Sequence, residues 1–520
     1  MIILHGINAP VGTPQEEITA AAARLLGVSA GKAHIHKISL DARKRSDIKL
    51  AASVCFELDP STEERLARRN DCVYASDQPF VPQTGGTEVP KGRIAVAGFG
   101  PAGMFAALIL AEAGYRPLVV ERGGDMESRT AAVDSYRRGG RIDTENNVQF
   151  GEGGAGTFSD GKLTTRIKDP VCRYVTRRFA EFGAPKEILT AAHPHIGTDN
   201  LTGIVRRIRE RIVSLGGEVR FGSRLDGIDV RNGEICGIRA GGDSIGVSAL
   251  ICAIGHSARD TYEMLLAGGA DLTAKSFAVG ARIEHLQESV DRSLYGDIHD
   301  PLLPVGEYQL SYTQGGRGVY TFCMCPGGVV MASASGEGEI VTNGMSAYAR
   351  DGRNANSAMI VSVSPDDFGH QPLDGVRFAL EIERRAFEAG AGLAPATTVR
   401  AFLKGEGSLE GRTVEPSYLP GVRETSLHEV LPPIITEKMT EGLRVFARRM
   451  KCFGDGGAVL TGPETRTSSP VRITRGADMQ SNIKGLFPCG EGAGYAGGIM
   501  SAAVDGIRQA QAVMNIYRPE

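Results

Sequence analysis

The stretch IAVAGFGPAGMFAALILAEAGYRPLVVERG, residues 94–123, decides the fold of this chain. A short apolar strand runs into the pattern GxGxxG at Gly98, Gly100 and Gly103, an apolar helix follows, and a second apolar strand ends at Glu121. Gly98 allows the tight turn, Gly100 lets a pyrophosphate reach the backbone, and Gly103 lets the helix pack on the strand. The helix N-terminus attracts phosphate, and Glu121 is expected to accept both hydrogen bonds of an adenosine ribose diol. The stretch predicts a Rossmann-type dinucleotide site.

A second glycine-rich unit near the C-terminus favours FAD over NAD as the dinucleotide. The sequence GLFPCGEGAGYAGGIM, residues 485–500, is an apolar strand ending at Gly490 and Glu491, followed by a glycine turn and a helix from about Ile499. Glu491 is expected to hold the ribitol or pyrophosphate edge, and the helix dipole to face the flavin pyrimidine ring and stabilise the anionic reduced form. The cofactor contacts predicted from the two units are Gly98, Gly100, Pro101, Ala102, Gly103, Glu121, Arg122, Gly490, Glu491, Gly497, Gly498 and Ile499.

Two further glycine turns lie between these units. The apolar run 249–254 ends at Gly255, as expected of a strand that closes over the cofactor. The run VQFGEGGAGTFSDGKLTTR, residues 148–166, is too rich in glycine for a regular element, and its glycines allow close approach to the cofactor. This run adds Gly153, Gly154, Gly156 and Thr157 to the predicted cofactor contacts, and it directs Ser159, Asp160 and Lys162 toward the ring or the substrate.

The chain of 520 residues is too long for one hydrophobic core, which rarely exceeds about 250–300 residues. The predicted fold class is α/β: a Rossmann-type FAD-binding domain with an inserted mixed β-rich substrate domain and a small N-terminal α+β module. Within the module, strands are expected at 2–4, 33–41 and 48–57, and helices at 15–26 and from Ser61. The predicted boundaries are 1–76 for the module, 77–92 for a linker, 93–276 and 451–520 for the two parts of the FAD-binding domain, and 277–450 for the insertion.

The composition of the chain limits the kinds of partner that it is expected to bind. The formal net charge of −3 provides no basic field for nucleic acid. The nearly uncharged run 94–114 contains five Gly or Pro residues, which interrupt regular helices and strands. It is therefore interpreted as a strand, a turn and a buried helix rather than as a membrane span. Nine scattered cysteines and no secretory signal favour the cytoplasm. A small-molecule substrate is expected, and the oligomeric state stays open.

Long motifs resemble one family, the uncharacterised FAD-dependent dehydrogenases of bacteria, which are single-Rossmann flavoproteins. The resemblance spans nearly the whole chain and implies FAD, a ferredoxin-like N-terminal module and a C-terminal portion special to the family, without implying a substrate. At HPHIGTD the chain departs from the KPHIGTD of the family at its first position, His193. The motifs are DARKRSDIKL (41–50), GEGGAGTFSDGKLTTR (151–166), HPHIGTD (193–199), FAVGARIEH (277–285), FCMCPGG (322–328), NGMSAYARDGRNANSA (343–358), TGPETRTSSPVRI (461–473) and CGEGAGYAGGIMSAAVDGI (489–507).

Catalytic candidates come from residue chemistry alone. Arg282 or Arg466 is a candidate for binding an anionic substrate group, and His285 or Lys162 for moving protons during hydride transfer. Cys323 is one residue from Cys325, too close for a CxxC redox turn and typical of alternating strand positions. The catalytic set predicted from the sequence is Lys162, Arg282, His285 and Cys323, with no metal site, because His193, His195 and Asp199 lack a fourth ligand.

Three functions fit these observations. The first is an FAD-dependent oxidoreductase of unknown substrate, with the flavin as hydride carrier. The second is an NAD(P)H-dependent flavin monooxygenase, and the third is a flavin-binding, redox-responsive interaction protein. No second strand-GxGxxG-helix unit occurs in the sequence, so NAD(P)H is expected only as a transient electron donor.

Overall fold

The computed structural model describes residues 1–75, 80–298 and 300–519. Its first part is a four-stranded sheet in the order β2-β3-β1-β4, with antiparallel neighbours and two helices on one face. This βαββαβ arrangement is ferredoxin-like, as the family resemblance implies. The elements are β1 (Ile2–Pro10), α1 (Gln15–Leu26), η1 (Ala30–Lys32), β2 (Ala33–Asp41), β3 (Lys49–Phe56), α2 (Pro60–Leu66) and β4 (Cys72–Tyr74).

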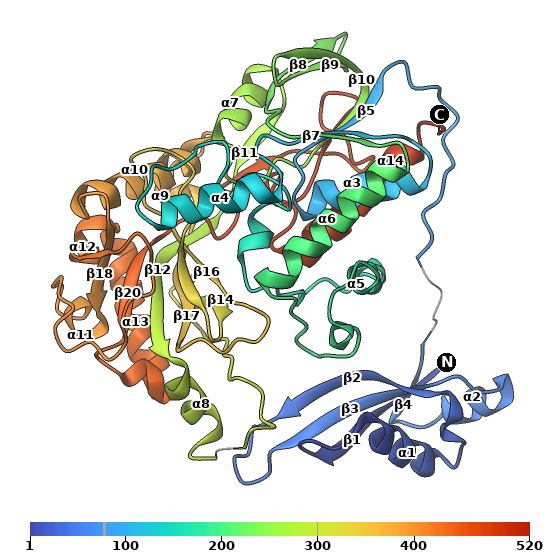
Figure 1. Cartoon of the computed structure of the whole chain (residues 1–520), viewed down its shortest axis with the longest axis vertical. Coiled ribbons are helices and arrows are strands. Elements are labelled where there is room, and N and C mark those ends of the chain that lie inside the picture. The colour runs from blue at the N-terminus through green and yellow to red at the C-terminus, as the bar shows by residue number, and fades with distance from the viewer. Residues whose placement is uncertain (76–79, 299, 520) are drawn as a thin grey trace.

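The second part is the Rossmann-type sheet in the order β7-β6-β5-β10-β9-β8, with β22 added beside β10. The strands β7, β6, β5, β10 and β22 run parallel, while β9 and β8 form an antiparallel extension. Figure 1 shows α3, α6 and α14 together on one side of this sheet. The elements are β5 (Arg93–Ala97), α3 (Pro101–Glu112), β6 (Leu118–Val120), α6 (Thr198–Ser214), β7 (Glu218–Arg220), β8 (Leu225–Arg231), β9 (Glu234–Ala240), β10 (Asp243–Cys252), α7 (Arg259–Ala267), β22 (Leu486–Pro488) and α14 (Ile499–Met514).

The apolar character of the run 94–114 follows from burial within this part. Every residue of α3 from Ala102 to Ala111 is buried, because the helix lies between the sheet and its neighbouring helices. No helix in the described part of the chain is both long and apolar enough to span a membrane.

The third part is a seven-stranded, mostly antiparallel sheet in the order β13-β14-β17-β12-β20-β18-β19. The strand β20, which lies between β12 and β18, comes after the predicted boundary at residue 450, so the inserted sheet extends beyond that boundary to Glu464. The elements are β12 (Phe277–Leu286), α8 (Gln287–Tyr295), β13 (Ser311–Gln314), β14 (Arg317–Cys325), β17 (Asn354–Val363), α9 (Pro365–Phe368), α10 (Asp374–Ala389), β18 (Ala394–Thr398), α11 (Val399–Phe402), β19 (Val422–Glu424), α12 (Leu427–Val430), α13 (Pro433–Arg449), η4 (Lys451–Gly454) and β20 (Val459–Glu464).

The remaining elements connect or flank the two large sheets. The pairs β15–β16 and β11–β21 form two small antiparallel ribbons. The elements are α4 (Met126–Arg137), η2 (Ala155–Phe158), α5 (Val171–Glu181), η3 (Lys186–Leu189), β11 (Leu272–Ala274), β15 (Val329–Ala332), β16 (Thr342–Met345) and β21 (Val471–Ile473).

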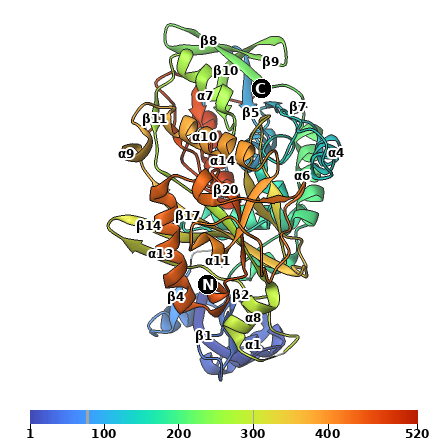
Figure 2. The same ribbon diagram turned by 90° about the vertical axis from the view of Figure 1, so that its left-hand side faces the viewer.

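The N-terminal module docks through its edge strand β2. The Ile38 N–H donates to the Thr190 carbonyl over 2.8 Å, and the Ala192 N–H donates to the Ile38 carbonyl over 2.9 Å. Arg45 adds hydrogen bonds to the carbonyl oxygens of Ser293 and Leu294. Figure 2 shows the module at one end of the molecule, beside α8.

The connection from the module crosses the surface of the Rossmann part. Its residues 77–79, within the predicted linker 77–92, lie outside the described residues. Farther along, the N–H groups of Gly86 and Glu88 donate to carbonyl oxygens of Met514 and Ile516, which ties the connection to the end of α14.

Candidate active site

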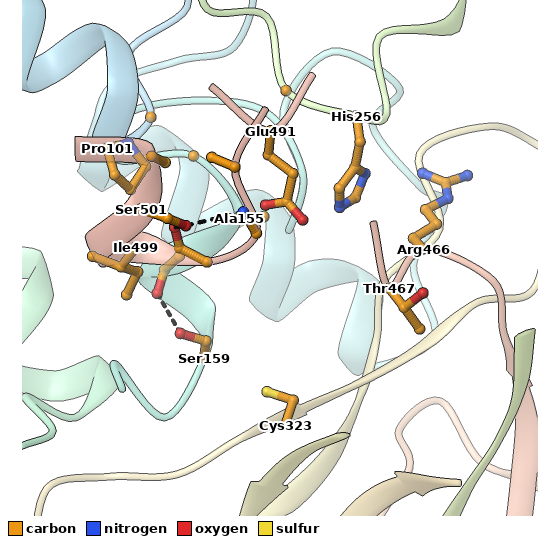
Figure 3. Close-up of a pocket in the computed structure, with 18 of the residues that line it drawn as sticks. Pro101, Ala155, Ser159, His256, Cys323, Arg466, Thr467, Glu491, Ile499 and Ser501 are labelled. Carbon is orange, nitrogen blue, oxygen red and sulfur yellow. Dashed lines mark hydrogen bonds between the residues drawn. The ribbon is translucent and has the colours of Figure 1, made fainter. Parts of the chain in front are cut away.

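A cavity of ≈ 1320 Å³ lies where the Rossmann part meets the inserted sheet. Its wall comes from the N-termini of α3 and α14, the glycine-rich run 154–167, the turn after β10, and β14 with its neighbours. Figure 3 shows Glu491 and Ile499 on one side of this cavity and Cys323 on another. Pockets for small molecules are usually roughly 300–1,000 Å³, so this cavity has room for a dinucleotide with space beside it.

Most of the predicted cofactor residues line the cavity. Four do not, and they lie behind its wall: Gly103, Gly153, Thr157 and Gly490. A Cβ atom on Gly103 would overlap the Gly98 carbonyl oxygen, so this glycine serves helix packing. The residues that do line the cavity are Gly98, Gly100, Pro101, Ala102, Glu121, Arg122, Gly154, Gly156, Gly255, Glu491, Gly497, Gly498 and Ile499.

The glycine turn after β5 keeps the start of α3 free of side chains. Gly98 has φ +97°, and a Cβ atom there would overlap the Ala253 carbonyl oxygen. A Cβ atom on Gly100 would meet only the Gly154 Cα, at 3.6 Å, because this glycine faces the cavity. The first N–H groups of α3 are left without helical partners beside this open space, where a phosphate can accept from them.

The Glu121 carboxylate is held by three backbone N–H groups. Phe99 N–H donates to its Oε2 over 2.7 Å, and the N–H groups of Gly123 and Gly151 donate to Oε1 over 3.0 and 2.9 Å. An ionised carboxylate offers about four lone-pair positions, so roughly one stays available. The open position is at Oε2, where Glu121 would accept from the predicted ribose diol.

Arg122 also lines the cavity, but its guanidinium is occupied. It donates to Glu145 and Asp260, with N···O distances from 2.9 to 3.1 Å, and lies 4.0 Å from the centroid of the Phe150 ring. This arrangement makes Arg122 a rigid wall at the end of the cavity near Glu121.

The N-terminus of α14 forms the opposite end of the glycine-rich wall. Gly498 has φ +99°, and a Cβ atom on Gly497 or Gly498 would meet nothing within 4 Å. Ser501 accepts from the Gly497 N–H over 2.9 Å and fixes the turn. Burial raises the pKa of Glu491 to about 7, although the Gly498 N–H and the charge of Lys275 act to lower it. Glu491 is thus poised to exist in both protonation states near neutral pH.

His256, which is not among the residues predicted from the sequence, also lines the cavity. Burial, with help from the charges of Arg466 and Arg259, lowers the pKa of His256 to about 4. Its Nδ1 lies 3.0 Å from the Ser257 hydroxyl. A neutral imidazole therefore faces the cavity at neutral pH. The local signal for it was its place directly after Gly255, at the end of a buried strand.

Arg466 lines the cavity but is already neutralised. Its guanidinium donates to Glu339 over 2.8 Å, to Glu383 over 3.0 Å and to the Ser335 hydroxyl over 2.5 Å. Arg259 shares Glu383 over 2.7 Å. The hypothesis that Arg466 binds an anionic substrate group does not fit this paired state.

Lys162 reaches the cavity together with Glu307 and His193. The Lys162 ammonium lies 3.2 Å from a Glu307 carboxylate oxygen, and His193 Nδ1 lies 3.0 Å from the other. The Lys162 side chain is partly exposed. Among the predicted catalytic residues, Lys162 and Cys323 are the two that line the cavity.

Arg282 is not available to a substrate, in contrast to the sequence-based hypothesis. It is fully buried and pairs with Glu464 over 2.6 and 2.9 Å. Its remaining donors reach the Cys323 carbonyl over 2.8 Å, Asn356 over 2.9 Å and Asn343 over 3.2 Å. Arg282 is therefore a positioning residue beneath the cavity wall.

His285 lies outside the cavity wall, which corrects its predicted role in proton transfer. Its ring is buried, 4.9 Å from the Phe453 ring centroid and 6.3 Å from that of Tyr308. Alternation along β12 turns His285 away from the side on which Arg282 and Glu284 point.

Cys323 occupies a bulge rather than a regular strand position. The pairing of β14 with β17 shifts between Phe322 and Cys325, and Cys323 has φ +44°. Cys323 lines the cavity, and Cys325 is fully buried behind it. The prediction of simple strand alternation for these two cysteines is wrong at this point.

His195 contributes to structure near the cavity mouth. Its Nε2 lies 3.1 Å from the Tyr348 carbonyl oxygen, and its ring stacks on that of Tyr348. Among the described residues, no group of three or more His, Cys, Asp or Glu side chains is arranged to hold a metal ion.

The wall fits FAD by its chemistry. Two helix N-termini, α3 and α14, open into one cavity at positions where glycine leaves the backbone bare, and an ionisable acid stands beside each. Bare backbone N–H groups suit phosphate and the polar edge of a flavin. Residues of the inserted sheet complete the wall on the side where a substrate has room.

Comparison with known proteins agrees with this chemistry. Residues 276–467 match the family model described as "FAD-dependent protein, C-terminal domain-like". An uncharacterized protein of Clostridium beijerinckii is 48% identical over 493 residues, which cover 93% of this chain and 92% of that protein. The family match supports FAD as the cofactor.

Solved structures with similar folds are distant. The glycine oxidase of Bacillus cereus is 11% identical, with 83% of this chain and 99% of that chain covered and a TM-score of 0.34. A geranylgeranyl bacteriochlorophyll reductase-like protein of Thermoplasma acidophilum is 15% identical, with 83% and 79% covered and a TM-score of 0.34. The structure of CtdE in complex with FAD is 12% identical, with 81% and 83% covered and a TM-score of 0.34.

Proposed function

Because the chain belongs to this family of FAD-dependent flavoproteins, we propose that it is an FAD-dependent oxidoreductase acting on a small-molecule substrate. The observation that carries the proposal is the single cavity that joins the glycine turn of α3, the N-terminus of α14 and the strand β14. A dinucleotide site alone would need only the first of these. The inserted sheet supplies a wall for a second molecule.

FAD, when bound, supplies two-electron transfer as a hydride. The N-terminus of α3 would hold the pyrophosphate, and Glu121 would accept from the adenosine ribose. The N-terminus of α14 supplies positive potential at the redox end of the site. Glu491, with a pKa of about 7, holds or releases a proton beside this helix.

The remaining cavity residues act on the substrate. Lys162 offers an ammonium group at the wall, held in place by Glu307 at 3.2 Å. His256 offers a neutral imidazole that accepts or donates a hydrogen bond without adding charge. Both groups orient a polar substrate in the cavity.

The test is cofactor content. We expect the purified full chain to be yellow, and denatured protein to release FAD in a ratio near one per chain. Added FAD should raise the Tm of cofactor-depleted protein, since a ligand that binds only the folded state stabilises it. Absence of released flavin together with no shift of Tm contradicts the proposal.

We propose NAD(P)H as a transient electron donor and the cytoplasm as the location. The first rests on the absence of a second strand-GxGxxG-helix unit from the sequence, and the second on nine scattered cysteines. Anaerobic stopped-flow mixing with NADPH or NADH should bleach the flavin absorbance. Bleaching that is much slower than turnover with another donor contradicts a nicotinamide donor.

A further inference from the structure

A strained turn carries one of two neighbouring thiols to the cavity wall. Cys323 has φ +44°, a region that side chains other than glycine rarely adopt, and it stands at the bulge of β14. It lines the cavity, whereas Cys325 is fully buried behind it. Strain of this kind persists only where surrounding contacts enforce it, and it concentrates at functional sites.

Arg282 and Cys325 enforce the turn. Both donate to the Cys323 carbonyl oxygen, Arg282 from Nη1 over 2.8 Å and Cys325 from Sγ over 3.3 Å. Glu464 fixes the guanidinium from the opposite side over 2.6 and 2.9 Å. The absence of a side chain at Gly344 gives this guanidinium its space, because a Cβ atom there would overlap Nη1. The buried ion pair of Arg282 and Glu464 therefore holds the turn that presents the Cys323 thiol to the cavity.

The charges around the two thiols make them different. The neighbouring Cys325 side chain, with the positive charges of Arg282 and Lys162, lowers the pKa of Cys323 against the effect of burial. The contact with Cys323, together with burial, raises the pKa of Cys325. The thiolate is the reactive form of cysteine, so Cys323, which lines the cavity, is the nucleophile, and the buried Cys325 keeps its proton.

We propose that Cys323 and Cys325 are a redox-active dithiol that reduces low-molecular-weight disulfides in the cavity. The Cys323 thiolate attacks one sulfur of the substrate, a mixed disulfide forms, and the substrate S–S bond breaks, with the leaving thiolate taking a proton from water. The Cys325 thiol then loses its proton and attacks Cys323 Sγ, which releases the second substrate thiol. The substrate gains two electrons, and the cysteine pair loses two.

Turnover of the pair rests on the proposed function. The Cys323–Cys325 dithiol would be regenerated by a hydride from bound reduced flavin, which would cleave the Cys323–Cys325 disulfide into one thiol and one thiolate. The first half of the cycle requires only the two cysteines and the disulfide. It is therefore measurable without turnover of the flavin.

The experiment uses the full-length protein as purified, reduced and freed of reductant, with cystamine as the disulfide probe. Mass spectrometry should find that the wild type loses two hydrogen atoms and that one peptide contains a Cys323–Cys325 disulfide. Cys325→Ser should stop at a stable cysteamine adduct on Cys323. The rates of Cys323→Ser and Cys323→Ala should be lower than the wild-type rate by roughly tenfold or more, since the nucleophile is lost. Cys236→Ser, which alters a partly buried cysteine outside the cavity, should react like the wild type.

Two results overturn the dithiol. One is a Cys323→Ser protein, folded by far-UV circular dichroism, that reacts at the wild-type rate. The other is a Cys325→Ser protein that carries its adduct elsewhere than on Cys323. The visible spectrum of the same samples separates this proposal from the flavin proposal. Protein that forms the disulfide but lacks flavin contradicts only the flavin site, and yellow protein that does not exchange contradicts only the dithiol.

Discussion

Gly100 is the residue whose missing side chain matters most for cofactor binding. It faces the cavity, and its Cβ position is 3.6 Å from the nearest heavy atom, the Gly154 Cα. A valine there keeps the turn but projects two methyl groups into the space for the pyrophosphate. We expect Gly100→Val to weaken FAD binding by roughly tenfold or more, which equals about 1.4 kcal/mol. Fluorescence titration of cofactor-depleted protein with FAD measures the effect.

Gly246→Val is the matched control. Gly246 lies in β10, and a Cβ atom there would have its nearest neighbour at 4.0 Å, the Cys236 carbonyl oxygen, away from the cavity wall. Its affinity for FAD should equal that of the wild type. Unchanged affinity in Gly100→Val would show that the phosphates do not pass this glycine.

The raised pKa of Glu491 leads us to expect that the free energy of unfolding depends on pH. Burial raises the pKa of its carboxyl from 4.5 to about 7, so the folded state binds the proton more tightly than the unfolded state. The stabilisation from this proton is complete below pH 4.5 and is lost as pH rises through 7. Glu491→Gln is neutral throughout. Its free energy of unfolding, relative to the wild type, should therefore rise between pH 5 and pH 8 by on the order of 1–3 kcal/mol.

Urea unfolding of cofactor-depleted protein at the two pH values tests this dependence. Glu410→Gln, which changes an exposed glutamate, should follow the wild type at both. A constant difference between Glu491→Gln and wild type would mean that the Glu491 carboxyl is ionised throughout this range.

The role of a residue could be predicted from the sequence where its contacts are with residues nearby in the chain. The roles of Gly98, Gly100 and Gly103 depend on neighbours a few positions away, so the pattern alone indicated them. Arg282 was assigned to a substrate because its partner Glu464 is 182 positions distant and invisible to local pattern. In the folded chain, the pairing of β12 with β20 brings Arg282 to Glu464, so its guanidinium is part of a buried ion pair and not free to bind a substrate.

At the scale of elements, one arginine on α4 holds the loop that supports Glu121. Arg129 is fully buried and donates to the carbonyl oxygens of Asn147, Val148, Gly151 and Glu152. Burial lowers its pKa to about 10, so it stays charged at neutral pH. We expect Arg129→Met to destabilise the fold by at least about 2 kcal/mol, because each buried acceptor left unpaired costs roughly 1–3 kcal/mol.

Two measurements separate a local effect of Arg129 from a global one. Hydrogen exchange should rise at Gly151, whose N–H donates to Glu121, before the core unfolds. FAD affinity should fall with it. Arg138→Met, at an exposed position just after the same helix, is the control and should change neither value. Unchanged exchange at Gly151 in Arg129→Met would show that the loop holds itself.

Predictability at the element scale depended on periodicity. The helix 15–26 and the strand 33–41 were predicted to the residue, because a clear pattern and clear end signals bound each of them. The three-residue strand β4 was not predicted, since so short a segment has no period of its own. The bulge at Cys323 also left no local signal, because it is imposed by the register of β17 and the Arg282 contact.

At the scale of the whole molecule, the module is attached by the outward edge of β2. Ile38 donates to Thr190 over 2.8 Å, and a proline at position 38 would remove this donor while leaving the inward pairs with β3 intact. Proline is tolerated at such edge positions. We expect Ile38→Pro to raise hydrogen exchange at Ala192 and cleavage by protease between the module and β5, without loss of FAD.

Leu40→Pro is the control, because position 40 lies two residues along the same edge and points its N–H the same way. It should leave both exchange and cleavage unchanged. Equal cleavage of the wild type and Ile38→Pro would show that Arg45 and its carbonyl partners hold the module unaided.

The strand pairing of β10 with β22 has a consequence for biosynthesis. Leu250 pairs with Leu486, and α14 comes next in the chain, so the first half of the Rossmann sheet is completed only by elements synthesised much later. During translation the N-terminal module emerges with all its strands, whereas the apolar faces of β10 and α3 stay uncovered until β22 and α14 have emerged. A nascent chain that stops before β22 contains the dinucleotide fingerprint but lacks the end of the cavity that α14 forms.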